Sequence, residues 1–509
     1  AKRLFNGCVP PCRVLIVAVL GSSLAFVEGS IVNLALPSLQ TDLGLDSVAL
    51  QWIVNAYLLT LSALMLVGGS AGDRYSLRGV FVGGLAIFGA ASAACGMVST
   101  PGLLVAFRAV QGAGAAFLVP TSLALINVHF NPEDRPRAIG LWAGASALTT
   151  AAGPLLGGAL VDAFNWRAVF LLIPPLALAA CGLALWRVPP RDAVRSQPLD
   201  VPGALLLMTG LALLTVSLVA FGEQSHAWAL LAFAVVALTG FVAYERRTAH
   251  PMLPLSLFGS GAFAGANVMT LLLYFALGGA LYFLPLNLMQ VQGYTALEAG
   301  AAFLPLTLLL GVGSMVAGDQ LKRYPPRSML TAGAGLTGVG LALLALPSDD
   351  SRYLTDWLPG IATVGLGMTL CVAPLTTVVM ASVPESRSGT ASGVNNTAAR
   401  LAGLFAIAAM TSLATAAFTR ELSIAIDQQG LADTLGQTLL EGARELGGLL
   451  NANRELGGSA RIVVSESYVT VFRQLMAFCS AFAFLAAATA WWTLGKAARP
   501  GNDATDTSQ

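Results

Sequence analysis

Long apolar runs recur along the whole chain and predict its architecture. A bilayer core about 30 Å thick needs roughly 20 apolar residues in a helix, and the runs here have that length. The alternation of apolar and polar residues that marks a membrane β-barrel is absent from the sequence. The pattern therefore predicts an all-α integral membrane protein with fourteen transmembrane helices, at residues 13–36, 48–70, 79–98, 102–128, 136–161, 166–187, 200–221, 226–245, 262–290, 297–318, 327–346, 355–379, 390–418 and 469–495.

The positions of Lys and Arg predict which side of the membrane each loop faces. Cytoplasmic loops carry an excess of basic residues. If the N-terminus is cytoplasmic, eighteen of the 27 Lys and Arg residues fall in inner segments and seven in outer segments, while Arg108 and Arg400 lie inside predicted helices. This distribution favours an even number of helices, with both termini in the cytoplasm.

One short pattern occurs twice, in corresponding loops. Residues 73–78 join the second and third predicted helices, residues 322–327 join the tenth and eleventh, and both contain Arg-Tyr-x-x-Arg. Two related bundles with a site between them at the midplane are typical of transporters. The predicted domains are a cytoplasmic N-terminus at 1–12, an N-terminal six-helix bundle at 13–187, two linker transmembrane helices at 188–261, a C-terminal six-helix bundle at 262–495 and a cytoplasmic tail at 496–509.

Residues 419–467 form the one long polar stretch within the predicted bundles. Their charge is mixed, and Leu435, Leu439 and Leu446 recur at helical spacing. The pattern predicts an extracytoplasmic loop with one or two short surface helices. A ligand-binding role for this loop is the alternative.

Composition narrows the possible partners. Hydrophobic residues make up 56% of the chain and charged residues 10%, whereas soluble proteins carry about 25% charged residues. A net charge of +1 gives no reason to expect binding to nucleic acid. The expected partners are the lipid bilayer, protons and a small-molecule substrate, and the chain is expected to act as a monomer.

The sequence offers no constellation for catalysis. The three histidines, His129, His226 and His250, are far apart, and neither a metal-ligand spacing nor an ATP-binding glycine loop is present in the sequence. We therefore expect no enzyme activity, no metal and no cofactor, with a proton gradient as the driving force. The six cysteines are scattered. Four of them lie in apolar runs and are interpreted as core residues, whereas Cys8 and Cys12 precede the first predicted helix, where metal binding or lipidation is an alternative.

Glu28 is the most informative single residue. It lies in the apolar run 14–36, where a carboxylate is costly unless it meets a partner, a cavity or a proton. At about 1.5 Å per residue, Glu28 lies roughly 13 Å from Pro37, and Arg108 lies roughly 10 Å from the start of its helix on the same side. We expect the two charges to share a polar cavity, with Gln111 one turn further in. The alternative is that Arg108 only binds backbone carbonyls.

Three motifs carry a family resemblance. They are Gly69-x-x-Gly72-Asp73-Arg74-x-x-x-Arg78 in an inner loop, Arg108–Gly114 in the fourth helix, and Thr149-x-x-x-Gly153-Pro154-Leu155-Leu156-Gly157-Gly158 in the fifth. Glycines let helices approach closely, and proline permits a kink. With these motifs the chain resembles the major facilitator superfamily and, within it, the fourteen-span drug:proton antiporter branch.

The resemblance implies roles for the motif residues. The inner-loop residues Gly69, Gly72, Asp73, Arg74 and Arg78 are implied to latch the cytoplasmic side in the outward-facing state. The fifth-helix residues Gly153, Pro154, Gly157 and Gly158 are implied to set the direction of transport as export. The chain departs from the family at Ser76, where a glycine is expected, at Leu77, where a basic residue is expected, and at Glu28, where aspartate is usual. The second loop copy has Lys322 in place of the acid and is interpreted as degenerate.

Together these features predict a multidrug efflux antiporter of the bacterial inner (cytoplasmic) membrane. It would export amphipathic or lipophilic small molecules by alternating access, with Glu28 and Arg108 coupling transport to protons. Phe26, Asn33, Asn55, Tyr57, Gln111, Tyr274, Tyr282 and Met289 are the candidate cavity residues. The acid favours cationic substrates, and Arg400 is interpreted as a residue between helices. An exporter of a lipid or another hydrophobic metabolite is the alternative.

Overall fold

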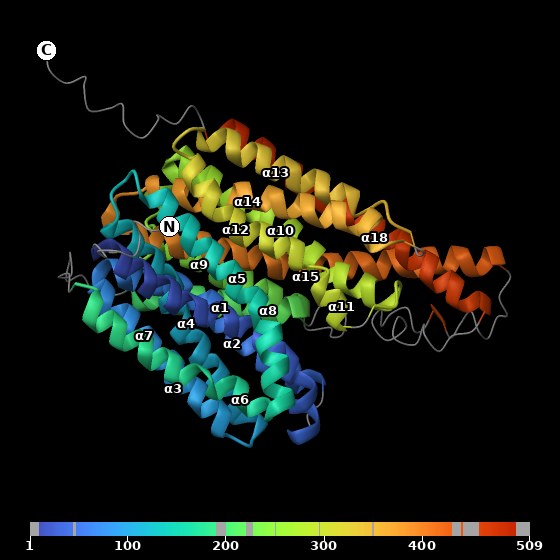
Figure 1. Ribbon diagram of the computed structural model, residues 1–509, viewed down its shortest axis with the longest axis horizontal. Coiled ribbons are helices and arrows are strands. Elements are labelled where there is room, and N and C mark those ends of the chain that lie inside the picture. The colour runs from blue at the N-terminus through green and yellow to red at the C-terminus, as the bar shows by residue number, and fades with distance from the viewer. Residues whose placement is uncertain are drawn as a thin grey trace, which may run out of the picture.

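The computed structural model describes residues 10–43, 47–189, 200–219, 227–249, 251–294, 296–348, 351–429, 439–440 and 458–494. All regular structure in these ranges is helical. The long helices run roughly side by side, with the N-terminal third of the chain grouped apart from the C-terminal half (Figure 1). The all-α prediction is confirmed for the described residues.

The first half of the chain supplies nine helices of the described structure. They are α1 (Pro10–Leu43), α2 (Ser47–Arg74), α3 (Leu77–Met97), α4 (Pro101–His129), α5 (Arg135–Ala163), α6 (Trp166–Leu171), α7 (Ile173–Arg187), α8 (Val201–Val219) and α9 (Ala227–Glu245). The predicted span 166–187 breaks at Leu172 because two prolines begin α7, and proline lacks the backbone N–H that would continue the helix.

The second half follows the same plan. Its described elements are η1 (Leu255–Gly259), α10 (Gly261–Gln290), α11 (Ala296–Ala301), α12 (Leu304–Gln320), α13 (Pro326–Leu343), η2 (Tyr353–Trp357), α14 (Leu358–Ala381), η3 (Glu385–Arg387), α15 (Ser388–Gln429) and α18 (Gly458–Thr493). Each of the fourteen predicted apolar runs overlaps one or two of these helical segments.

Ten helices among the described residues are long and apolar enough to cross a membrane. The other four predicted spans overlap α1, α5, α8 and α13, and the apolar part of α8 covers only Val201–Ser217. The protein is thus a multi-helix chain with membrane-spanning character, and the count of fourteen stays a prediction.

The predicted loop 419–467 is too long, because the helices on either side continue into it. α15 ends at Gln429 and α18 begins at Gly458, and the residues between them lie outside the described ranges apart from 439–440. Phe418, Leu422 and Ile426 repeat every four residues and are buried with Tyr468 in one cluster. Because of this apolar stripe, α15 and α18 pack together beyond residue 418, where the predicted apolar run ends. The two helices project past their neighbours (Figure 1).

Two separate hydrophobic cores account for the two bundles. One joins residues between Val14 and Val188 with Met380 and the partly buried Val372 from α14. The other joins residues between Leu257 and Leu494. α8 and α9 share a smaller cluster with α2, which includes Leu66, Leu207 and Phe241. The linker helices therefore pack on the outside of α2.

Candidate functional site

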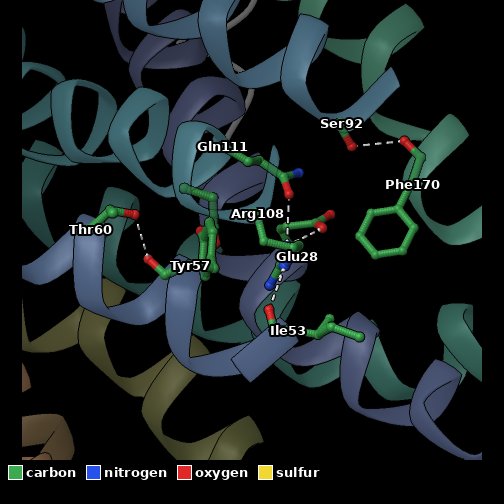
Figure 2. Close-up of polar contacts among 9 residues, drawn as sticks. Glu28, Ile53, Tyr57, Thr60, Ser92, Arg108, Gln111 and Phe170 are labelled. Atoms are coloured by element: carbon green, nitrogen blue, oxygen red, sulfur yellow. Dashed lines mark hydrogen bonds and ion pairs between the residues drawn. The ribbon is translucent and has the colours of Figure 1, made fainter. Parts of the chain in front are cut away.

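Glu28 and Arg108 form a buried ion pair between α1 and α4. The Arg108 guanidinium donates to the Glu28 carboxylate over 2.8 Å and to the Gln111 side-chain oxygen over 2.7 Å. Glu28 is fully buried and Arg108 is 1% exposed. The three side chains converge on one point in the N-terminal bundle (Figure 2). The structure thus brings together the acid and the base that the sequence placed at similar depth, with the amide of Gln111 one turn further along α4.

The rest of the Arg108 environment comes from α2 and α6. Its Nε donates to the Ile53 carbonyl over 3.0 Å, and its guanidinium lies 4.4 Å from the centre of the Tyr57 ring. Tyr57 in turn donates to the Ala25 carbonyl over 2.8 Å. These contacts compensate for removing a charged group from water. Arg108 therefore binds a backbone carbonyl and the acid at the same time, so the alternative that it binds only backbone carbonyls is wrong.

Small residues make this geometry possible. A Cβ added to Gly112 would lie 2.3 Å from the Tyr57 carbonyl oxygen, so α4 and α2 meet at backbone distance there. This close approach brings the side chain of Arg108, one turn earlier, within reach of Ile53.

Two polar atoms in the cluster have no hydrogen-bond partner among the described residues, Glu28 Oε2 and Gln111 Nε2. One carboxylate oxygen is therefore available to a proton.

The structure does not gather all the candidate cavity residues around this pair. Tyr57 and Gln111 touch it, whereas Phe26 packs edge-on against Trp142 and Asn55 is half-buried. Tyr274 and Met289 pack against the C-terminal core, and Tyr282 is 40% exposed beside Phe283. The side chain of Asn33 lies outside the described part of the structure.

Arg400 is a functional candidate to which the sequence reasoning gave little weight. It lies on α15 at spacings of eleven and seven residues from Gly389 and Gly393, which both pack at backbone distance on α2. The same helix face therefore directs Arg400 toward the N-terminal bundle. It lies within electrostatic range of Tyr57 and Tyr274, which come from opposite bundles. Among the described residues, it makes no hydrogen bond or ion pair.

Asp73 joins the two bundles at the far end of α2. Its two carboxylate oxygens accept hydrogen bonds from the backbone N–H groups of Gly389 and Thr390, each over 2.7 Å. These N–H groups belong to the first turn of α15, where unpaired donors and the helix dipole favour an anion. Asp73 therefore caps α15, on the opposite bundle.

The other inner-loop residues support this contact. A Cβ on Gly69 would lie 2.0 Å from the Gly389 carbonyl oxygen, so no larger residue fits without separating α2 from α15. Gly72 faces the Thr121 side chain. Arg74 donates to the Pro251 carbonyl over 2.9 Å, and Arg78 donates to the Val188 carbonyl over 3.1 Å.

The fifth-helix motif lies where α5 packs against α1. A Cβ on Gly157 would lie 2.9 Å from the Ile31 carbonyl oxygen, three residues beyond Glu28 on α1. Gly153 is also buried. The surroundings of Pro154 and Gly158 lie outside the described part of the structure. The role of all four motif residues in the direction of transport stays a prediction.

A second contact between the bundles lies between α5 and α12. Gly318 packs on the Pro136 carbonyl, Arg137 pairs with Asp319 over 3.6 Å, and Lys322 pairs with Asp134 over 3.8 Å. Arg135 pairs with Glu385 beside them. The sequence comparison aligned the two Arg-Tyr pairs and so placed Lys322 opposite Asp73. It missed Gly318-Asp319, which lies one turn earlier and matches Gly72-Asp73 in the first copy. Asp319 is therefore the acid of the second copy.

Comparison with known proteins agrees with this architecture. The family model of the Major Facilitator Superfamily matches residues 18–407. The tetracenomycin C resistance and export protein of Streptomyces glaucescens is 31% identical over 77% of this chain and 74% of its own length. The puromycin resistance protein pur8 of Streptomyces alboniger is 34% identical over 79% of this chain and 82% of its own length.

Solved structures agree on the fold. A bacterial homolog to the human lysosomal transporter Spinster, inward-facing and unoccupied, aligns with a TM-score of 0.58 over 96% of this chain and 98% of its own, at 18% identity. The family and its relatives identify a transporter rather than an enzyme. This chain, a multi-pass membrane protein built from two bundles with a buried ion pair in the first, belongs to the major facilitator superfamily.

Proposed function

We propose that the protein exports amphipathic or lipophilic small molecules in exchange for protons, by alternating access between its two bundles. Fourteen spans with both termini in the cytoplasm, in the inner membrane of a bacterium, are part of the proposal. The printed names of the relatives support the substrate class, since they describe resistance to antibiotics and their export. The observation that carries the proposal is the buried pair of Glu28 and Arg108.

A proton on Glu28 changes the charge of the N-terminal bundle. With Glu28 ionised, the pair is neutral and the Arg108 guanidinium has an acid to bind. With Glu28 protonated, Arg108 keeps only Ile53, Gln111 and the aromatic faces as partners. A charge left without a counter-charge in a buried site is unfavourable. The two protonation states therefore favour different arrangements of α1, α2 and α4, which is what coupling requires.

The contacts at the Asp73 end of α2 support the direction of access. Asp73, Gly69 and Gly389 hold α2 against α15, while Gly318 and Asp319 hold α12 against α5. With both contacts closed, the bundles are joined at this end. In the proposed orientation this end is cytoplasmic, so the conformation is closed toward the cytoplasm and a proton reaches Glu28 from the outer side.

The substrate is proposed to bind between the bundles beside Arg400. Because Arg108 already neutralises Glu28, the acid no longer argues for a cationic substrate. Arg400 is half-buried about 18 Å into α15 and lies within electrostatic range of Tyr57 and Tyr274, which come from opposite bundles. A basic residue inside a membrane protein marks a substrate or ion pathway. A substrate with an aromatic body and a carboxylate or phenolate group fits this set.

Transport in proteoliposomes tests the function. Wild type, Glu28→Gln and the control Asp427→Asn, which changes an exposed acid at the end of α15, are compared with ethidium and a carboxylated fluorophore under an imposed pH gradient. Wild type and control should accumulate substrate against its gradient. Glu28→Gln should retain counterflow but lose the response to pH. Gradient-driven accumulation by Glu28→Gln at the wild-type level would refute the role of Glu28, and no gradient response in wild type would refute antiport.

A further inference from the structure

A second pair of acids is buried on the linker helices, away from Glu28. Asp200 immediately precedes α8, and Glu245 is the last residue of α9. They are 6% and 3% exposed. Asp200 Oδ1 accepts a hydrogen bond from the Gly203 N–H over 2.9 Å and so caps α8, while Glu245 Oε2 accepts one from the Leu253 N–H over 3.2 Å.

The remaining oxygen of each acid faces the other. Asp200 Oδ2 and Glu245 Oε1 are buried without a hydrogen-bond partner among the described residues. A Cβ added to Gly203 would lie 2.5 Å from the first and 3.0 Å from the second, so both oxygens converge on one place beside Gly203. Only glycine leaves both oxygens room there. The acids thus form a site in which two acceptors meet with no donor.

Among the described residues, no ion pair joins a basic side chain to either acid. Arg246 and Arg247 follow Glu245 but are exposed. Arg74, from α2, donates to the Pro251 carbonyl. An apolar cluster lies beside α8 and α9, to which α2 and α15 contribute Ala63, Leu64, Leu66, Val67, Val394 and Leu401. Two carboxylates in contact cannot both ionise in such surroundings. If they share one proton, the protonated carboxyl donates a hydrogen bond to the other carboxylate, and both free oxygens then have a partner.

We propose that Asp200 and Glu245 together bind one proton, forming a second proton-binding site on the linker helices. Protonation changes the charge of the pair from −2 to −1 and adds one hydrogen bond between the acids. The site is linked to the α2–α15 contact, because Glu245 holds the Leu253 N–H and Arg74 holds the neighbouring Pro251 carbonyl. Loss of the proton would push the acids apart and move this segment beside Asp73.

Infrared difference spectroscopy of the purified full chain tests the site directly. A protonated carboxyl has a C=O stretch that an ionised carboxylate lacks. In a Glu28→Gln background at pH 7, we expect one such band that disappears in both Glu245→Gln and Asp200→Asn, since either change leaves the other acid free of its like charge. Gly203→Ala keeps both acids but separates them, so it should shift or abolish the band. Asp427→Asn is the control and should leave it unchanged.

Three outcomes would overturn the proposal. The first is a spectrum without the band at pH 7, and the second is a band that survives both substitutions. The third is a band that emerges only when sodium, potassium and divalent ions are removed, which would assign the site to a metal cation. If Glu245→Gln fails to fold, Asp200→Asn, which keeps a helix cap, carries the test alone. The band is measured on purified protein without substrate or a proton gradient. A negative result in the transport assay of the proposed function would therefore leave this test unaffected.

Discussion

The two bundles share a fold but treat their charged groups differently. In the N-terminal bundle, Glu28 and Arg108 neutralise each other in a fully buried pair, and Asp73 is held by two backbone N–H groups. In the C-terminal bundle, Arg400 has no acid among the described residues, and Asp319, the counterpart of Asp73, is about half exposed in an ion pair. The first bundle is thus built around compensated charges, whereas the second keeps its charges available.

This difference suggests a division of labour. A compensated buried charge responds strongly to a proton, because protonation removes its partner. An uncompensated charge responds strongly to a ligand of opposite sign. Proton binding in one bundle and substrate binding by the other would meet at Tyr57, whose ring lies against Arg108 and which lies within electrostatic range of Arg400. Four substitutions test the comparison.

Removing the base from the buried pair should have the largest effect. Arg108→Gln leaves Glu28 buried without its counter-charge, and breaking such a pair costs about 3–5 kcal/mol of stability. The double variant Glu28→Gln/Arg108→Gln removes both charges and should recover most of that loss. Thermal unfolding at pH 7 measures both. Equal stability of the single and double variants would mean that the two charges do not compensate each other.

Weakening the Asp73 contact should have the next largest effect. Asparagine has one side-chain oxygen and no charge, so Asp73→Asn loses at least one hydrogen bond to a charged group, worth about 1.5–3 kcal/mol. A loss of that size lowers the ratio of molecules with the α2–α15 contact closed to molecules with it open by at least about tenfold. Electron-resonance distances between spin labels at the exposed positions Tyr75 and Ser386, in a cysteine-free background, should lengthen. An unchanged distance distribution would remove Asp73 from the latch.

Neutralising Arg400 should alter substrate choice without removing transport. We expect Arg400→Gln to reduce uptake of a carboxylated fluorophore by about tenfold relative to its carboxamide analogue, as expected for one lost charge contact of about 1.4 kcal/mol. Arg400→Lys keeps the charge and should retain most of the preference. An equal reduction for both compounds would assign Arg400 a structural role and leave the substrate charge open.

The sequence predicted the helices well because apolar length alone determines them. The runs fell on helices throughout, and the depth of Glu28 and Arg108, counted from helix ends, brought them to the same place. It failed where packing overrides composition: α15 and α18 extend into a polar stretch because Phe418, Leu422 and Tyr468 pack together. It also missed Asp319, because a one-turn shift between repeat copies is visible only once Gly318 is seen against Pro136.

The smallest effect is expected at the second contact between the bundles. Asp319→Asn breaks the pair with Arg137, whose side chains are both nearly half exposed, and exposed pairs contribute about 0–1 kcal/mol. The balance between conformations should therefore move by less than about fivefold, well below the effect of Asp73→Asn, and the small shift should vanish in high salt because exposed charges are screened. The same spin-label distance measures both variants. If Asp319→Asn opened the bundles as far as Asp73→Asn, the two contacts would be equivalent, and the asymmetry between the bundles would not extend to the contacts that join them.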